Sequence, residues 1–329
     1  MRKCLMHIGT HKTGTTSIQA MLAGHRPDLA RHGWLYPTAG IPGGLFGHHN
    51  AAWELIHDHR FRPQHGTVAD LLDEIDKSEL DVILSSEYFE CAVHDHATFG
   101  IFIEVLRGRA LEVTIVVYLR NQVDYARSLY LELLNHQYDT TFDEFVSEVL
   151  EHRTIRWKKW VFAFCYRDFL KKLPAETNII VRSYDRVHSV IDDFPSILGV
   201  SPPDLNVHSD LRVQQQLPIS SAFAAFYENR TSNGLDAGRP WLLPLIARAL
   251  DGPEVGMARV TRERLITAYH ESNHFVESRY GLSGLIDMPR TRLDSTGEPV
   301  SGPSLEGIFS ATTTHLIEAI VDAGQGRRT

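Results

Sequence analysis

The sequence predicts an α/β fold in which a central parallel sheet is covered by helices on both faces and is followed by a largely helical C-terminal half. Two observations lead to this prediction. From the N-terminus to Tyr184, short apolar runs alternate with segments of helical periodicity, and such alternation is typical of βαβ units around a parallel sheet. Beyond that point the apolar residues recur at helical spacing. The chain has 329 residues and is 43% hydrophobic, so it can bury a large core.

The strands of the sheet are expected at four short apolar runs. In chain order these are Cys4–Ile8, Asp81–Ser86, Leu111–Leu119 and Asn178–Tyr184. The third run gives the strongest indication because it is rich in β-branched residues. Helices are indicated between the strands by apolar residues that share one face. They are expected around Ile18, Met21 and Leu22, and at Val68–Ile75, Ile101–Leu106 and Asp124–His136.

The second half of the chain is expected to be mostly helical. Three segments carry an apolar stripe at helical spacing: Arg156–Leu173, Ile219–Arg230 and Arg262–Tyr280. Residues 288–304 are rich in Pro, Gly, Ser and Thr and are expected to form a linker. We therefore expect a single α/β domain over residues 1–287, and a C-terminal helix within residues 305–329 that docks on the same domain.

Charge and cysteine content restrict the partners and the setting of the chain. The net charge of −8 argues against broad binding of nucleic acid or of an anionic membrane. The sequence contains no run of about 18 apolar residues, so no transmembrane helix is expected. Three well-separated cysteines, Cys4, Cys91 and Cys165, together with an N-terminus that lacks a signal-peptide pattern, favour a cytoplasmic protein. Neither of the two His-Asp-His triplets has a third ligand at a predictable spacing, so no metal site is expected.

The loop after the first strand has the character of a phosphate-binding loop. In "HIGTHKTGTTS", Gly9 and Gly14 keep the spacing of the NTPase motif G-x-x-x-x-G-K-[ST]. Thr15 occupies the lysine position of that motif, and Lys12 lies inside the loop instead. Backbone N–H groups at the start of the following helix would point at an anion. From its position Lys12 would face a group attached to a single 5′-phosphate rather than straddle a triphosphate.

A second anion-binding element is expected at the end of the strand Leu111–Leu119. Arg120 follows this strand directly, and ligands of open α/β sheets bind beyond the carboxyl ends of the strands. Ser128 lies eight residues further on, on the expected helix, so both side chains could converge on one phosphate. No strand ends in the aspartate that holds Mg²⁺ in NTPases, which favours chemistry without a metal.

These two motifs resemble those of sulfotransferases that use 3′-phosphoadenosine 5′-phosphosulfate (PAPS). "HKTGTTS" is similar to their 5′-phosphosulfate loop and "LRNQVDYARSLY" to their 3′-phosphate motif. The resemblance is closest to bacterial sulfotransferases that modify carbohydrates. It implies a P-loop-like three-layer fold, PAPS as the donor, 3′,5′-adenosine bisphosphate as the product, and a hydroxyl-bearing acceptor such as a glycan or glycolipid.

The resemblance also implies a role for individual residues. Lys12 would contact the bridge between phosphate and sulfuryl group, where negative charge builds up as the S–O bond breaks. Arg120 and Ser128 would bind the 3′-phosphate, and Tyr184 would lie near the adenine. The residues expected to bind the donor are His11, Lys12, Thr13, Gly14, Thr15, Thr16, Ser17, Arg120, Ser128 and Tyr184. The Arg-Lys-Gly loop of the small-molecule branch is not evident, so one side of the 3′-phosphate site is unassigned.

Two residues are candidates for the base that takes the proton from the acceptor hydroxyl. Glu87 follows a predicted strand end beside the expected donor site, and glycan-modifying members of the family use a glutamate near such a strand end. His49 precedes a predicted helix, and its side-chain type has the better intrinsic pKa, near ~6.5. Position therefore favours Glu87 and the intrinsic pKa favours His49.

Two other classes of function are compatible with the loop. An NTP-dependent, P-loop kinase-like transferase shares the glycine spacing but lacks the lysine position and the metal-binding aspartate. A non-catalytic nucleotide-binding module would need the loop alone. Binding of the bisphosphate compared with ATP plus Mg²⁺ separates these classes.

Overall fold

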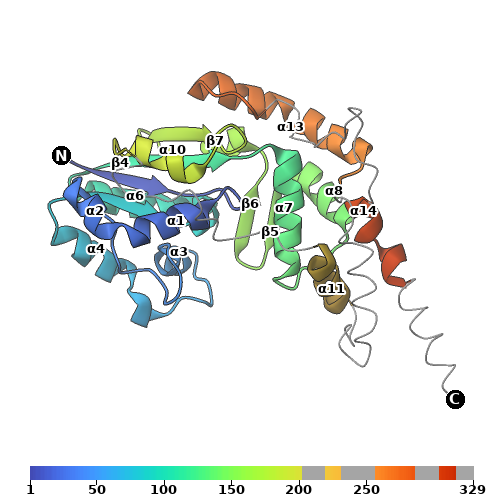
Figure 1. Ribbon diagram of the computed structural model, residues 1–329, viewed down its shortest axis with the longest axis horizontal. Coiled ribbons are helices and arrows are strands. Elements are labelled where there is room, and N and C mark those ends of the chain that lie inside the picture. Colours follow the sequence, from blue (N-terminus) through green and yellow to red (C-terminus); the bar gives the residue numbers. More distant parts are fainter. Residues whose placement is uncertain (202–218, 231–255, 286–303, 316–329) are drawn as a thin grey trace, which may run out of the picture. The chain divides into compact units, whose positions relative to one another are not determined.

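Figure 1 shows the computed structural model, which describes residues 1–201, 219–230, 256–285 and 304–315. The contacts divide the chain into two compact units. We call the first the sheet unit; it comprises Met1–Asn121, Thr154–Gln215 and Tyr269–Asp287. The second, the helical unit, comprises Gln122–Arg153, Gln216–Ala268 and Met288–Thr329. The linker predicted at residues 288–304 lies outside the described residues except for Ser304.

The sheet unit is built on five parallel strands in the order β2-β3-β1-β4-β7. Their bounds are β1 Arg2–His7, β2 Trp34–Leu35, β3 Asp81–Ser85, β4 Leu111–Leu119 and β7 Asn178–Ser183. The four predicted strands are confirmed within one or two residues, and the two-residue β2 adds an edge that was not predicted. The central strand is β1, in which Leu5 is paired with Ile83 of β3 and with Thr114 of β4. The loop that follows β1 therefore starts from the middle of the sheet.

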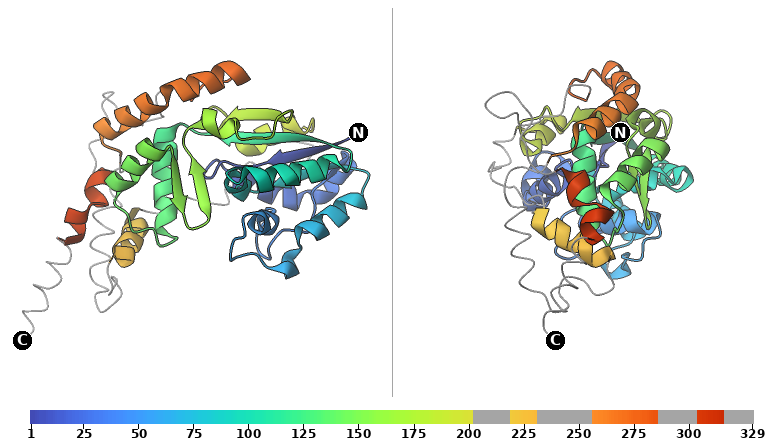
Figure 2. Two further views of the ribbon diagram at one scale, coloured as in Figure 1. Left: turned by 180° about the vertical axis from the view of Figure 1, so that it is seen from behind. Right: turned by 90° about the vertical axis from the view of Figure 1, so that its right-hand side faces the viewer.

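Helices cover both faces of this sheet, as predicted. Those of the sheet unit are α1 Thr15–Gly24, α2 Arg26–Arg31, α3 His49–Leu55, α4 Val68–Asp76, α5 Tyr88–Val93, α6 His96–Arg107, α9 Tyr166–Leu170 and α10 Val190–Ile197, with a 3₁₀ turn at Pro63–His65. In Figure 1 α1 lies in front of the sheet, and in the opposite view of Figure 2 α6 lies in front. The arrangement is a three-layer α/β architecture.

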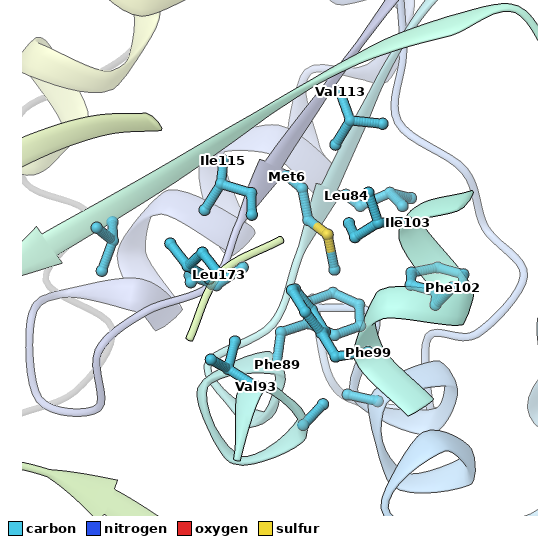
Figure 3. Packing of buried hydrophobic residues seen from close by; sticks show 14 of the residues in the cluster. Met6, Leu84, Phe89, Val93, Phe99, Phe102, Ile103, Val113, Ile115 and Leu173 are labelled. Carbon is cyan, nitrogen blue, oxygen red and sulfur yellow. The ribbon is translucent and has the colours of Figure 1, made fainter. Parts of the chain in front are cut away.

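The core of the sheet unit consists of two apolar layers, one on each face. Alternate residues of a strand point to opposite faces, so Met6 of β1 belongs to one layer and Leu5 to the other. The first layer includes Leu84, Ile115 and the aromatic rings of α5 and α6 (Figure 3). The second layer packs α1, α2 and α10 on the opposite face. Burial on both faces explains why the strands appear in the sequence as continuous apolar runs.

One prediction for the second half of the chain is wrong. The segment Arg156–Leu173 was expected to be helical, but most of it forms an antiparallel hairpin of β5 Thr154–Trp157 and β6 Trp160–Ala163, and only α9 is helical. Trp157 and Trp160 are paired across a two-residue turn, in which Lys158 has a positive φ of 56°. Aromatic and β-branched residues favour strands, and all four residues of β6 are buried, so packing selects the hairpin.

The helical unit contains α7 Gln122–Leu134, α8 Phe142–His152, α11 Ile219–Arg230 and α14 Leu305–Ile308, and the long helix α13 Arg259–Tyr280 contributes residues to both units. Helices were predicted at four of these five places, and α8 was not predicted. Aromatic rings from three segments pack together: the ring centroid of Phe309 lies 5.3 Å from that of Tyr130 and 5.5 Å from that of Phe226. Residues 316–329 of the predicted terminal helix lie outside the described residues. None of the described helices has the length and apolar character needed to cross a membrane.

Candidate active site

The loop after β1 is attached to the end of β4 by backbone hydrogen bonds. The N–H of Tyr118 donates to the carbonyl of Gly9 (2.8 Å), and the N–H of Thr10 donates to the carbonyl of Tyr118 (3.0 Å). The loop ends at Gly14, which caps the N-terminus of α1 in the left-handed conformation with φ 77°. The strand–loop–helix arrangement predicted from the sequence is present, and the N-terminal end of α1 opens at the edge where β1 and β4 end.

Neighbouring segments pack tightly against both glycines. A Cβ atom on Gly9 would lie 3.2 Å from the Cα of Glu87, and one on Gly14 would lie 2.8 Å from Cγ2 of Val190 and 3.3 Å from Cε2 of Tyr184. These positions require glycine for space as well as for φ. The same contacts show that Glu87 and Tyr184, both predicted site residues, lie directly against the loop.

The side chains of the loop fall into two groups. The hydroxyls of Thr13 and Thr15 are buried and donate to the carbonyl of Thr10 at 2.5 and 3.4 Å, so they stabilise the loop itself. Thr16 and Ser17 are half-buried in the first turn of α1, where the backbone N–H of Ser17 donates to the carbonyl of Gly14 (3.0 Å). Lys12 is half-buried and has a positive φ of 60°. The loop thus offers an anion the end of α1 and a lysine.

Arg120 lies beside this loop, as expected for a residue that follows β4. One of its NH groups donates to the carbonyl of Lys12 (3.4 Å), and its guanidinium carbon lies 5.1 Å from the ring centroid of Tyr184. Asp185 lies 3.6 Å from its Nε. Ser128 is buried on α7 and belongs to the helical unit, so its convergence with Arg120 on one phosphate stays a prediction.

The structure brings the two candidate bases together. Glu87 is the N-cap residue of α5, and its Oε2 accepts a hydrogen bond from Nε2 of Gln19 (2.9 Å). Nδ1 of His49 lies 3.8 Å from the same carboxylate oxygen and 2.9 Å from Oγ of Ser86. The alternatives from the sequence are therefore two parts of one cluster.

The protonation states within this cluster follow from burial and charge. Burial lowers the pKa of His49, and Glu87 opposes this shift only in part. Burial by itself would raise the pKa of Glu87, but His49, His11 and the Gln19 amide together bring it below its ordinary value. At neutral pH the pair consists of an ionised carboxylate and a neutral imidazole.

Glu90 is a residue that the sequence interpretation missed. It lies one helical turn after Glu87 on α5 and is fully buried. Its carboxylate accepts hydrogen bonds from the backbone N–H of His11 (3.0 Å), from Nδ1 of His11 (2.8 Å) and from the N–H of Ala163 (3.0 Å). The two glutamates three positions apart after a buried strand are the signal that could have suggested a shared face.

Arg60 is the second residue missed from the sequence. Its guanidinium carbon lies 4.4 to 4.6 Å from the ring centroids of Trp53, Tyr88 and Trp160. The carboxylate of Asp58, which is 5% exposed, accepts hydrogen bonds from the Nε and NH2 groups of Arg60. The ring of His49 lies 5.9 Å from that of Trp53 and 5.3 Å from that of Tyr88. This aromatic cluster fixes the orientation of His49 next to Glu87.

Comparison with known proteins gives no further guide to this site. Neither the models of known protein families, nor curated proteins, nor solved structures match the chain. Among the described residues, no group of three or more His, Cys, Asp or Glu side chains is arranged to hold a metal ion. The chemical interpretation therefore depends on the geometry of the loop, Arg120 and the Glu87–His49 pair.

Proposed function

We propose that the protein is a sulfotransferase that moves the sulfuryl group of PAPS to a hydroxyl group of an acceptor, a carbohydrate or glycolipid. The observation that carries this proposal is the position of Lys12. It stands inside the loop before Gly14, not after it, and the loop directly contacts Glu87. A phosphate-binding loop, a cation within it and an adjacent base are the three groups that sulfuryl transfer requires.

The residues along the loop fit the donor. The N-terminal end of α1 favours the 5′-phosphate through its N–H groups and its dipole. Arg120 offers a guanidinium for the 3′-phosphate. The ring of Tyr184 lies beside this guanidinium, where it would contact the adenine of the donor. Lys12 would stabilise the negative charge that develops on the bridging oxygen, an interaction that is stronger in the transition state than in the ground state.

The Glu87–His49 pair supplies the proton acceptor. The reaction forms a bond from the acceptor oxygen to sulfur, breaks the bond from sulfur to the bridging oxygen, and releases the hydroxyl proton. Glu87 is ionised and His49 neutral at pH 7 because of their lowered pKa values, so either group can accept that proton. We favour Glu87 because it lies directly against the loop, with His49 as the alternative.

The test is an untargeted transfer assay. Native protein is incubated with ³⁵S-labelled PAPS and with separate panels of glycans, glycolipids and phenols, and labelled products are separated by chromatography. The proposal predicts label in the carbohydrate or glycolipid panel with native protein and its loss with Lys12→Ala. Absence of label in every panel, with a protein that is folded by circular dichroism, would contradict the proposed activity.

A further inference from the structure

Gln19 is a polar side chain on a buried face of α1 that is otherwise largely apolar. It is 1% exposed, and its buried neighbours along the helix include Ile18, Met21 and Leu22. A side-chain amide in such a place is costly unless it is hydrogen-bonded. Its Nε2 donates to Oε2 of Glu87 at 2.9 Å. This bond joins residues 68 positions apart and connects α1 to the start of α5.

The backbone of Gly47 lies directly against the amide of Gln19. A Cβ atom on Gly47 would lie 2.5 Å from both Cδ and Nε2 of Gln19, and 2.8 Å from its Oε1. Gly47 is buried and is not among the glycines with a positive φ, so its backbone conformation does not require glycine. The amide of Gln19 requires it, because any larger residue would occupy the space of that amide. Gly47 therefore fixes the orientation in which Gln19 reaches Glu87.

The known contacts of the Glu87 carboxylate gather on one of its oxygens. The amide of Gln19 donates to Oε2, and Nδ1 of His49 lies 3.8 Å from the same atom. An ionised carboxylate only accepts hydrogen bonds, so Gln19 must present its NH₂ group. The side chain of Glu87 is 17% exposed, so the carboxylate is open to an approaching group. The oxygen available to that group is Oε1.

We propose that Gln19 is a positioning residue of the transfer reaction, which holds Oε2 of Glu87 so that Oε1 takes the proton of the acceptor hydroxyl. The proton moves to Oε1 while the acceptor oxygen bonds to sulfur. The electron pair of the breaking bond between sulfur and the bridging oxygen leaves with the bisphosphate. The N-terminal end of α1 faces the donor, so one helix sets the positions of donor and base. This inference rests on the proposed function, since it concerns the same reaction.

The same hydrogen bond favours the ionised form of Glu87. Burial alone would raise the pKa of this carboxyl group, and His49, His11 and the Gln19 amide together bring the pKa below its ordinary value. A hydrogen bond to the charged form favours that form, so loss of the Gln19 amide should raise the pKa. Other ionisable groups near Glu87 are uncharged at pH 7, because burial lowers the pKa of His7 and raises the pKa values of Tyr36, Tyr88 and Cys91.

The experiment measures turnover and the KM for PAPS between pH 5 and pH 8. The probes are ³⁵S-labelled PAPS and a fixed mixture of the glycans and glycolipids of the transfer assay. Gln19→Met keeps an unbranched side chain of similar volume and removes the donor. Gly47→Ala keeps the donor, but its Cβ displaces the amide from Glu87. Glu87→Gln and the double variant Gln19→Met/Glu87→Gln complete the set.

Two substitutions serve as matched controls. Gly43→Ala lies in the same loop as Gly47, but a Cβ there would meet its nearest neighbouring atom at 3.8 Å, an ordinary contact. Leu22→Met is a volume-conserving change on the same buried face of α1 as Gln19. Both should behave like native protein. Circular dichroism checks the fold of every variant, and Gly47→Ala gives the answer if Gln19→Met does not fold.

The expected loss lies in turnover and not in donor binding. Gln19→Met should lower turnover about 10–10²-fold, the usual effect of a misplaced catalytic group, and change the KM for PAPS less than about threefold. Gly47→Ala should give the same pattern, because it separates the same two atoms. The decline of turnover at acidic pH should begin at a higher pH in Gln19→Met than in native protein. The double variant should lose no more than Glu87→Gln alone, since residues that act as a unit do not have additive effects.

Three outcomes would overturn the inference. If Gln19→Met and Gly47→Ala retain turnover within about threefold of native protein, the bond to Glu87 does not position the base. If the losses multiply in the double variant, Gln19 acts independently of Glu87. If the KM for PAPS rises while turnover is kept, Gln19 supports donor binding instead. Native protein that transfers no sulfuryl group would end the proposed function together with the inference, whereas any of the three outcomes in an active protein removes the inference alone.

Discussion

The proposed role of Lys12 follows from its position within the loop. It has a left-handed backbone conformation inside the loop, and Arg120 donates to its carbonyl. A lysine after the second glycine would extend from the first turn of α1, but Lys12 extends from the loop itself. Under the proposed function, it would contact a single leaving oxygen rather than a chain of phosphates.

Replacing Lys12 tests this role. Lys12→Ala should lower turnover by about 10²–10³, the usual loss for one electrostatic contact to the transition state, and should weaken bisphosphate binding much less. Turnover is measured with ³⁵S-labelled PAPS and affinity by calorimetry. Lys3→Ala, which removes an exposed lysine of β1, is the control and should behave like native protein. Turnover within a few-fold of native in Lys12→Ala would exclude the leaving-group role.

The roles of Glu87 and His49, the two candidates for the general base, can be distinguished by substitutions that preserve side-chain shape. Glu87→Gln keeps the hydrogen-bonding geometry toward Gln19 and removes the basicity, so turnover should fall about 10²–10⁴-fold with donor affinity nearly unchanged. His49→Asn should reduce turnover only a few-fold. With Glu87 as the base, the turnover of native protein should decline only below the ordinary value of about 4.5 for this group, because its pKa is lowered. The reverse pattern in the two variants would assign the base to His49.

At the same scale, local sequence predicted some site residues and not others. Gly14 and Lys12 belong to one short motif whose spacing by itself predicts a phosphate-binding loop. Glu90 and Arg60 act through partners that are distant in sequence: Glu90 through His11 and Arg60 through Tyr88 and Trp160. No spacing rule connects such partners, so only the folded chain shows them.

Among the elements, the junction between loop and α1 is the one that most constrains the site. Gly14→Ala would place a Cβ 2.8 Å from Val190 at a φ of 77°, which either displaces α10 or distorts the loop. We expect a loss of about 1–3 kcal/mol in the free energy of unfolding and at least tenfold weaker bisphosphate binding. Urea denaturation and calorimetry measure the two effects.

The glycine at the other end of α1 provides the control. Gly24 ends α1, and a Cβ there would have no heavy atom within 4 Å. Gly24→Ala should leave bisphosphate binding unchanged and alter stability between zero and a gain of about 1 kcal/mol. Equal effects of the two substitutions would mean that Gly14 has no special role.

The hairpin of β5 and β6 shows where periodicity is insufficient. Its residues also fit a helical stripe, and short apolar runs do not distinguish the two structures by period alone. What selects the strands is tertiary: Trp160 donates to Asp58, and the N–H of Ala163 donates to Glu90. The run Leu111–Leu119 was predicted correctly because it is rich in β-branched residues, which favour strands.

For the whole molecule, buried histidines make stability depend on pH. Burial lowers the pKa of His7 from 6.5 to about 4 and that of His48 from 6.5 to about 3. Between these values and 6.5 the unfolded chain binds protons that the folded chain does not, so the free energy of unfolding falls as pH falls. The contribution of His7 amounts to about 3 kcal/mol when fully lost.

Urea denaturation at steps from pH 7.5 to pH 5 measures this dependence. Stability should be level above about pH 7 and should decrease steadily below 6.5. Carboxyl groups with a lowered pKa, such as Glu87 with its ordinary value of 4.5, act below this range and do not interfere. His7→Gln, which can still hydrogen-bond to Ser85, should give a shallower decrease. A level profile down to pH 5 would show that these histidines are not buried in neutral form.

The central claim is that the loop binds the nucleotide of a sulfuryl donor rather than a nucleoside triphosphate. A thermal-shift measurement with 3′,5′-adenosine bisphosphate, and separately with ATP plus Mg²⁺, tests it most directly. A ligand of the native state at 100 times its Kd stabilises by about 2.7 kcal/mol, a clear rise in Tm. If the loop binds the nucleotide of a sulfuryl donor, Tm rises with the bisphosphate alone, without added metal, and does not rise with ATP plus Mg²⁺. A rise with ATP plus Mg²⁺ and none with the bisphosphate would contradict it and favour a kinase-like transferase.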